Sequence, residues 1–322
     1  MRIVVTGSLA YDYIMNFPGY FKEHILPEKV HMLTVSFLVD SMKRLRGGTA
    51  GNIAYNLALL GEKPVLVASA GQDFDEYRKA VEPLGVDTGS IKIVSDEFTA
   101  SCFINTDQSN NQIVAFYPGA ANHSRELALD ALKLGKDDWA IISPTDPVSM
   151  ARHTQECKRL GVKYIFDPGK QTPRLDKQQI LAGLDGCSLL VGNDYEFGMM
   201  AKAIGWSEDK LIAAAPITVI TRGEEGSWIY DNTAGKKLEI PIAKPKAAVD
   251  PTGCGDAYIS GFAFALARGF SLELAGRVAA LTATYCLELK GCQEHRFTKA
   301  DFVARYAQTF GAAPQLDAWA RG

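Results

Sequence analysis

The sequence lacks the features that mark several large classes of protein. No apolar run reaches the ~20 residues that a membrane-spanning helix needs. The first residues, MRIVVTGS, have neither the basic region nor the long apolar stretch of a signal peptide. The formal net charge is only −3 over 322 residues, so charge gives no reason to expect nucleic acid or a membrane surface as a partner. We therefore expect a cytoplasmic protein with neither kind of partner.

Motifs for several common chemistries are also missing. The six cysteines form no C-x-x-C pair, and the five histidines form no H-E-x-x-H motif. There is no G-x-x-x-x-G-K-[ST] phosphate loop. The segment TGSLAYD, after the first apolar run, does not match the G-x-G-x-x-G of dinucleotide-binding proteins. Disulfide scaffolds, zinc enzymes, common hydrolases and nicotinamide dehydrogenases are therefore poorly supported.

The chain does contain a regular alternation of short β-branched runs and helix-length segments. Buried strands are expected at 3–8, 64–69, 139–143, 164–167, 189–193 and 217–221, a hairpin within 227–242, and helices at 147–160, 194–204, 255–268 and 271–289. Strands that alternate with helices predict an α/β class, with a largely parallel sheet covered on both faces.

Two regions break this alternation with short extended pieces. They indicate a small β-rich lid, made of 13–46 and 91–118, inserted into the α/β body. The body then comprises 1–12, 47–90 and 119–310. The remaining segment, 311–322, is expected to be a loosely ordered tail.

The stretch VDPTGCGDAYISGF (249–262) is the first candidate site. Pro251 cannot continue a strand ladder, so the chain turns there. Gly253 and Gly255 allow close approach to the backbone, and the apolar spacing that follows indicates a helix. The N–H groups of the first helical turn carry partial positive charge, and Asp256 lies among them. Either Asp256 merely caps the helix, or the N–H groups hold an anion while Asp256 handles a proton.

Other short motifs each allow a functional and a structural interpretation. Gly47 and Gly48 precede a helix that contains Asn52, which could bind hydroxyl groups or simply face solvent. Asp12 could bind a sugar diol or form an Asx turn. Asn193 and Glu196 could hold waters around Mg²⁺ or cap a helix. The motif TRGEEG (221–226) is a strand-to-hairpin turn that could line a nucleotide.

Together, the order and spacing of GSLAYD, GGTAGN, NDYE, TRGEEG and DPTGCGD resemble the ribokinase/PfkB family of carbohydrate kinases over roughly residues 1–300. The resemblance implies an ATP-dependent kinase with a ribokinase-like, Rossmann-type layered α/β/α body and a small β lid. It also implies that Asp256 is the base, and that an anion hole is formed by the N–H groups of Gly253, Cys254 and Gly255.

The resemblance implies roles for the other motifs as well. The acceptor hydroxyls would be bound by Asp12, Gly48 and Asn52. The ATP site would contain Asn193, Thr221, Gly223 and Gly226. Magnesium would be held through water by Asn193 and Glu196, and a monovalent cation such as K⁺ by Asp250 and Thr252.

The acceptor is expected to be a nucleoside. GSLAYDYI and AFYPGAA (115–121) resemble the adenosine and nucleoside kinase branch, and the lysine common in sugar-phosphate kinases is replaced by Thr49. Aromatic residues that could enclose a base, or could be lid core, are Tyr11, Phe103, Phe116 and Tyr117. We expect phosphorylation of the 5′-hydroxyl of adenosine or a related nucleoside. The alternatives are a kinase of free ribose or fructose, and a catalytically silent sensor; either a monomer or a homodimer is compatible with the sequence.

Three positions depart from the family pattern. In YIFDPGKQTPR (164–174), Gly169 replaces the polar residue common after D-P, so only a supporting role is expected of Asp167. Cys254 replaces the usual alanine of the anion hole, which keeps the backbone donors available. Arg222 stands where many relatives have an uncharged residue, and it could reach a phosphate or pair with Glu224 or Glu225.

Overall fold

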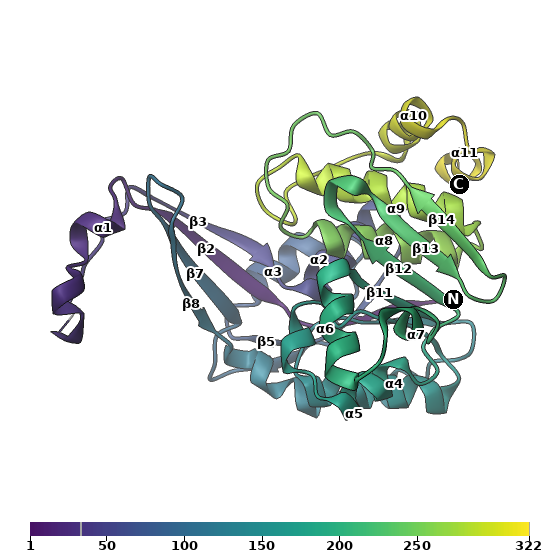
Figure 1. Ribbon diagram of the computed structural model, residues 1–322, viewed down its shortest axis with the longest axis horizontal. Helices are drawn as coiled ribbons and strands as arrows, with labels where there is room; N and C mark the ends of the chain where they lie inside the picture. The colour runs from purple at the N-terminus through teal and green to yellow at the C-terminus, as the bar shows by residue number, and fades with distance from the viewer. Residues whose placement is uncertain (33, 322) are drawn as a thin grey trace.

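The computed structural model describes residues 1–32 and 34–321. An eight-stranded sheet forms the centre of the body (Figure 1). Its spatial order is β14 (Lys236–Ile240), β13 (Ser227–Asp231), β12 (Ile217–Thr221), β11 (Leu189–Asn193), β10 (Lys163–Phe166), β9 (Trp139–Ile142), β1 (Ile3–Thr6) and β4 (Val65–Val67). The strands from β4 to β12 are parallel, and β13 and β14 run antiparallel. The predicted parallel α/β sheet is confirmed.

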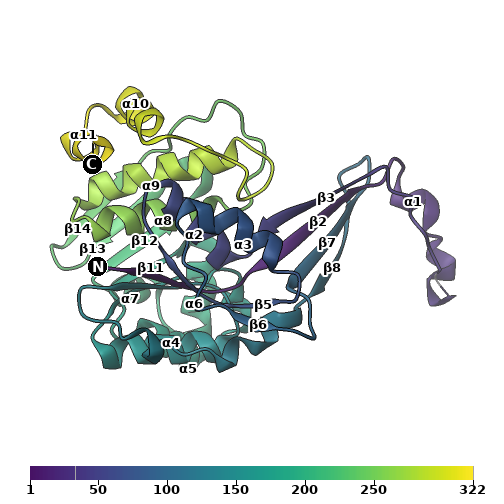
Figure 2. The same cartoon turned by 180° about the vertical axis from the view of Figure 1, so that it is seen from behind.

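Helices cover both faces of this sheet because the parallel strands are apolar on both sides (Figure 2). One face packs against α2 (Thr49–Leu59), α3 (Asp75–Val81), α8 (Cys254–Ala267), α9 (Leu272–Leu287), α10 (Lys299–Phe310) and α11 (Pro314–Arg321). The other packs against α4 (Pro147–Leu160), α5 (Lys177–Leu184), α6 (Asp194–Ile204) and α7 (Glu208–Ile212). None of the helices in the described residues is long and apolar enough to cross a membrane.

The expectation of a loosely ordered C-terminal tail is wrong. Residues 314–321 form helix α11, and Leu316 and Trp319 are buried. The Trp319 ring lies edge-on to Phe264 of α8, with ring centroids 5.2 Å apart. The apolar residues of this segment recur at helical spacing, and that pattern suffices to attach the segment to the core.

A separate four-stranded sheet projects from the body (Figure 1). Its order is β3 (Ser41–Gly47), β2 (Ala10–Asn16), β7 (Ala100–Thr106) and β8 (Gln112–Tyr117). The short helix α1 (Phe21–His24) lies beyond its far end. Short 3₁₀ segments are found at Pro27–Met32, Glu82–Leu84, Gly119–Glu126, Asp130–Leu132, Gly169–Arg174 and Gly223–Glu225.

Two details of this region differ from expectation. Residues 91–94 do not join the four-stranded sheet: β6 (Lys92–Val94) pairs with β5 (Ser69–Gly71) in a two-stranded sheet of its own. Asp12, the last residue of the predicted body segment 1–12, lies inside β2 of the four-stranded sheet. The reason is that short apolar runs specify a strand without specifying its partner.

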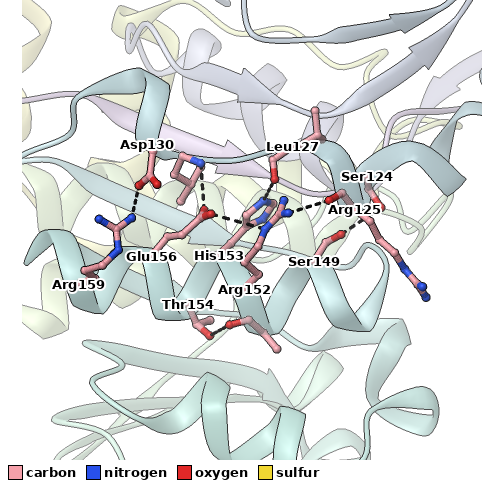
Figure 3. Close-up of polar contacts among 12 residues, drawn as sticks. Ser124, Arg125, Leu127, Asp130, Ser149, Arg152, His153, Thr154, Glu156 and Arg159 are labelled. Carbon is pink, nitrogen blue, oxygen red and sulfur yellow. Dashed lines mark hydrogen bonds and ion pairs between the residues drawn. The ribbon is translucent and has the colours of Figure 1, made fainter.

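Hydrogen bonds connect residues 119–129, which follow β8, to helix α4 (Figure 3). Buried His153 donates from Nε2 to the Leu127 carbonyl at 3.2 Å, and burial lowers the pKa of this imidazole to about 4, so the ring is neutral. Glu156 accepts the Leu129 N–H at 3.0 Å, and Arg152 donates to the Arg125 carbonyl at 2.7 Å. These bonds hold 119–129 in place where it forms part of a cavity wall.

Candidate active site

A cavity of about 1050 Å³ lies at the carboxyl ends of the parallel strands. The strand ends contribute Ser8 after β1, Pro144 after β9, Asp167 after β10, Asn193 of β11 and Thr221 of β12. The four-stranded sheet contributes the opposite wall, and the N-terminus of α8 contributes part of the floor. Ligands of open α/β sheets bind at this edge because the strand-to-helix loops meet there.

The turn into α8 is built around two glycines. Gly253 has φ +81°, and a Cβ placed on it would lie 2.9 Å from the Cys292 Sγ, so only glycine fits. A Cβ on Gly255 would meet no atom within 4 Å, because this residue borders the cavity. The first N–H groups of a helix have no partner within it. Of the three predicted anion-hole donors, the Cys254 N–H already donates to the Pro251 carbonyl at 3.2 Å.

Asp256 follows in the first turn of α8 and lines the same cavity. Its Oδ2 accepts a hydrogen bond of 2.8 Å from Asn52 Nδ2, which reaches it from α2. Burial, and to a lesser degree the Glu196 carboxylate, raises the pKa of Asp256 to about 6, while Asn52 and Lys170 oppose this rise. The carboxyl group is therefore ionised at neutral pH and protonated in moderately acidic solution.

Asn52 is thus committed to a protein partner. Its side chain is buried, with 4% of the residue exposed, and its amide bonds Asp256 rather than projecting freely into the cavity. The second hydrogen of Nδ2 is available to a ligand, because an amide nitrogen carries two.

Three carboxyl groups of the cavity interact electrostatically, those of Asp167, Glu196 and Asp256. Burial raises the pKa of Asp167 well above its ordinary value, and Glu196 and Asp256 raise it further. Burial also raises the pKa of Glu196, and the positive charge of Lys170 opposes this rise. All four residues line the cavity, and the positive charge of Lys170 acts on Glu196 and Asp256.

Asn193 and Glu196 form the capping arrangement that the sequence allowed. Asn193 Oδ1 accepts the Glu196 N–H at 2.8 Å, and Glu196 Oε2 accepts the Asn193 N–H at 2.9 Å. Both residues also line the cavity. In the described residues, no group of three or more His, Cys, Asp or Glu side chains is arranged to hold a metal ion. The donor set still fits Mg²⁺, since hard oxygen ligands supplemented by water and phosphate are what this ion takes.

Asp12 meets the glycine turn that precedes α2. A Cβ on Gly47 would lie 2.7 Å from Asp12 Oδ2. Gly48 has φ +84°, and its Cβ would lie 2.5 Å from the Ser8 carbonyl oxygen. Position 48 therefore requires glycine, whereas a side chain at position 47 would displace the Asp12 carboxylate. Burial raises the pKa of Asp12, and the positive charge of Lys170 lowers it.

The predicted nucleotide loop is only partly at the cavity. Thr221 lines it, whereas Gly223 and Gly226 lie in the turn between β12 and β13 and are absent from the described lining. Gly226 has φ +87°, and a Cβ there would lie 2.1 Å from the Ile240 carbonyl oxygen, so the hairpin itself requires it. Arg222 pairs with Glu225 and lies over the Trp228 ring, 3.8 Å from its centroid.

The predicted cation ligands are engaged in a loop contact. Asp250 Oδ1 accepts the Thr252 N–H at 3.0 Å, and its Oδ2 accepts the Gly291 N–H at 3.1 Å. Oδ1 therefore stabilises the turn before α8 itself, and Oδ2 connects this turn to the segment after α9.

The four candidate aromatic residues lie in different places. Phe116 of β8 lines the cavity and is 63% exposed. Tyr11 belongs to the core, and Phe103 stacks on Tyr13 with centroids 4.8 Å apart. Tyr117 neighbours Phe116 in the strand and so points to the opposite face.

Two residues of the site escaped the sequence motifs. Lys170 lines the cavity and interacts electrostatically with Asp12, Glu196 and Asp256. Its only local signal was its position just after the strand-end Asp167. Gln293, which bonds Asn52, lies in no motif at all.

A carboxylate at a helix N-terminus, at the edge of a parallel sheet and below a second sheet, defines a site suited to phosphoryl transfer to a small hydroxyl compound. Comparison with known proteins agrees. A family model for pfkB family carbohydrate kinases matches residues 2–299. The chain therefore belongs to the pfkB family of carbohydrate kinases.

Individual relatives are similar over nearly the whole chain. A nucleoside kinase of Methanothermobacter thermautotrophicus is 32% identical over 319 residues, covering 98% of each chain. The structure of a Burkholderia thailandensis nucleoside kinase in complex with inosine has a TM-score of 0.83 and 35% identity, covering 96% of this chain and 98% of that one. Its complex with ADP-inosine has a TM-score of 0.80 and 36% identity, covering 96% of both chains.

Proposed function

We propose that this chain is a nucleoside kinase that transfers the terminal phosphoryl group of ATP to the 5′-hydroxyl of adenosine or a related purine nucleoside. The observation that carries the acceptor class is one row of the four-stranded sheet. Asp12 pairs with Cys102, and Cys102 pairs with Phe116 on the next strand. All three line the cavity.

The spacing within this row suits a nucleoside. Adjacent strands lie about 4.8 Å apart, so the backbones of Asp12 and Phe116 are roughly 10 Å apart. A carboxylate that binds the ribose hydroxyls and an aromatic ring that stacks on the base match the two ends of one nucleoside. A free sugar would leave the Phe116 end unfilled. The nucleoside kinases among the relatives, one of them in complex with inosine, support the same acceptor class.

In the proposed reaction, the acceptor hydroxyl oxygen attacks the terminal phosphorus of ATP and its proton passes to Asp256. The bond from that phosphorus to the bridging oxygen breaks, and ADP leaves with the bond's electron pair. The N–H groups of Gly253, Cys254 and Gly255 face the charge that spreads over the transferring group. The Cys254 N–H donates to the transferring group only after its hydrogen bond to the Pro251 carbonyl breaks.

The remaining charged groups support the nucleotide. Asn193, Glu196 and Thr221 would lie beside the phosphates, and Glu196 would hold Mg²⁺ through water. When bound, Mg²⁺ would neutralise part of the negative charge of the phosphates. Lys170 adds a positive charge between the acceptor and nucleotide ends. Assignment of Gly223 and Gly226 to the ATP site, and of Asp250 and Thr252 to K⁺, remains a prediction of the family resemblance.

We also propose that the four-stranded sheet of β2, β3, β7 and β8 acts as a lid. Phe116 is largely exposed although it faces the cavity, so movement of this sheet toward the body would bury its ring against a base. Closure would exclude water from the phosphoryl group, which suppresses hydrolysis of ATP.

The test is a panel of acceptors supplied with ATP and Mg²⁺: adenosine, inosine, guanosine, cytidine, ribose and fructose. We expect ADP formation to depend on the acceptor, with the highest kcat/KM for a purine nucleoside. Phosphorus NMR of the product should identify the 5′-monophosphate. A higher kcat/KM for ribose or fructose would overturn the acceptor assignment, and no acceptor-dependent ADP formation would overturn the kinase assignment.

A further inference from the structure

Gln293 lies behind the proposed base and is completely buried. It belongs to the segment after α9, and its Nε2 donates to two oxygens. One is Asn52 Oδ1 at 2.9 Å, and the other is the Tyr77 hydroxyl at 2.5 Å. The Tyr77 hydroxyl in turn donates to the Gly47 carbonyl at 2.9 Å. Hydrogen bonds therefore run from Gln293 through Asn52 to Asp256.

The directions of these bonds depend on one another. An ionised carboxylate can only accept, so it requires the nitrogen of the Asn52 amide to face it. Asn52 Oδ1 must then face Gln293, and it needs a donor there. The nitrogen of the Gln293 amide provides that donor, and the Tyr77 hydroxyl, having donated to Gly47, accepts its second hydrogen. Only this orientation of both amides allows all four bonds, and it leaves Gln293 Oε1 buried without a hydrogen-bond partner among the described residues.

We propose that Gln293 is a positioning residue: it holds Asn52 in the orientation that donates to Asp256, and so keeps the proposed base ionised. Without that donor, the Asn52 amide loses one of the two partners that distinguish its ends, and only the Asp256 carboxylate remains to orient it. A rotated amide would place its oxygen against the carboxylate, which favours the protonated form. This inference rests on the proposed role of Asp256.

Other titratable groups near Asp256 also influence the pKa of its carboxyl group. The groups that interact electrostatically with its carboxyl are Lys170, Glu196, Asp167, Cys254, Cys286 and Cys292. Within the part of the chain that the structure describes, Gln293 makes no hydrogen bond to any of them, so its replacement removes the bonds to Asn52 and Tyr77 and leaves these groups in place.

The experiment compares Gln293→Met with Tyr77→Phe. Methionine has a similar length and volume but no donor. Phenylalanine removes the other partner of the Gln293 amide while leaving the Asn52–Asp256 bond intact. Both variants lose a buried hydrogen bond, so thermal unfolding should show comparable destabilisation. The pH dependence of kcat/KM for the nucleoside separates them.

For Gln293→Met we expect the acidic limb to move upward by roughly one pH unit. Activity relative to wild type would fall about fivefold at pH 6 and recover above pH 8, with the KM for ATP unchanged. For Tyr77→Phe the limb should stay in place. A folded Gln293→Met variant whose limb has not moved would overturn the inference. Absence of acceptor-dependent turnover in the wild type would instead overturn the proposed function.

Discussion

Replacement of Asp256 by asparagine is the most direct test of the site. The amide has nearly the same shape as the carboxyl group, and its oxygen can still accept the Asn52 hydrogen bond that Asp256 Oδ2 accepts at 2.8 Å. The substitution therefore removes one property, the capacity to take a proton from the acceptor hydroxyl. We expect kcat to fall by roughly 10²- to 10⁴-fold, the usual contribution of a general base.

The pH dependence of kcat/KM in the wild type should follow the ionisation of Asp256. With a pKa of about 6, most of the Asp256 carboxyl group is ionised at pH 7.5. Below pH 6, kcat/KM should fall about tenfold per pH unit, because only the ionised form accepts the proton. The residual activity of Asp256→Asn should not show this fall below pH 6, because residue 256 no longer ionises. An acceptor-dependent ADP release assay from pH 5 to 9 measures both.

Binding and stability distinguish loss of chemistry from loss of structure. Calorimetry should show ATP binding no weaker in Asp256→Asn, since the change removes a negative charge near the phosphates. Asp209→Asn, an exposed residue of α7, matches the charge change away from the site and should behave as wild type. Near-normal kcat in Asp256→Asn, with the fold and ATP binding intact, would refute the assignment of the base.

The same substitution should stabilise the fold without ligands. The pKa of Asp256 is raised from 3.8 to about 6, so between these values the native state binds more protons than the unfolded state. This carboxyl group therefore costs stability progressively as pH rises from about 4 to 6. At pH 7.5 the cost is at most ~3 kcal/mol, and less because water in the cavity partly screens the charge. Urea unfolding should show a gain for Asp256→Asn above pH 6 that vanishes near pH 4.

Three further predictions concern the acceptor end and the cavity wall. Phe116→Ala should raise the KM for the nucleoside roughly tenfold through loss of stacking, whereas Phe103→Ala, on the other face of the sheet, should leave it unchanged; steady-state kinetics with saturating ATP measure both. Asp12→Asn should raise the same KM roughly 10- to 100-fold, because charge-assisted bonds to the ribose are lost, and equal KM values would contradict this role. Glu156→Ala should lower the free energy of unfolding by ~1–3 kcal/mol since it leaves the Leu129 N–H unpaired, and Glu156→Gln should lose less; urea unfolding compares the two.

The body of the fold could be predicted because its signals are local. Helix α4 has Pro147 at its first position and Gly161, in the left-handed conformation, just past its end, and these are ordinary start and stop signals. Strand β11 is a short apolar run that ends at Asn193, which caps the next helix. Such features depend on neighbouring residues in the sequence, so they can be recognised without knowledge of the tertiary structure.

The errors and omissions arise where distant segments meet. Nothing in 91–94 indicates that it pairs with Ser69–Gly71 rather than with the four-stranded sheet. Asn52 and Asp256 are 204 positions apart, and Gln293 is 241 positions from Asn52. The motifs located Asn52 and Asp256 separately. Their contact, and the donor behind it, became visible only in three dimensions.

The arrangement of carboxyl groups also explains why Asp256, rather than its neighbour, is suited to be the base. Asp167 is the more deeply buried, and burial with its acidic neighbours raises its pKa well above the ordinary value. Only a backbone hydrogen bond at Gly169 opposes this rise. Asp256 experiences the same kind of environment, but the Asn52 amide and Lys170 hold its pKa to about 6. The pKa of Asp167 is thus raised further than that of Asp256, so Asp256 is the better suited of the two to accept a proton from the acceptor hydroxyl. The difference depends in part on the orientation of the Asn52 amide, which is why a buried glutamine outside every motif bears on the chemistry.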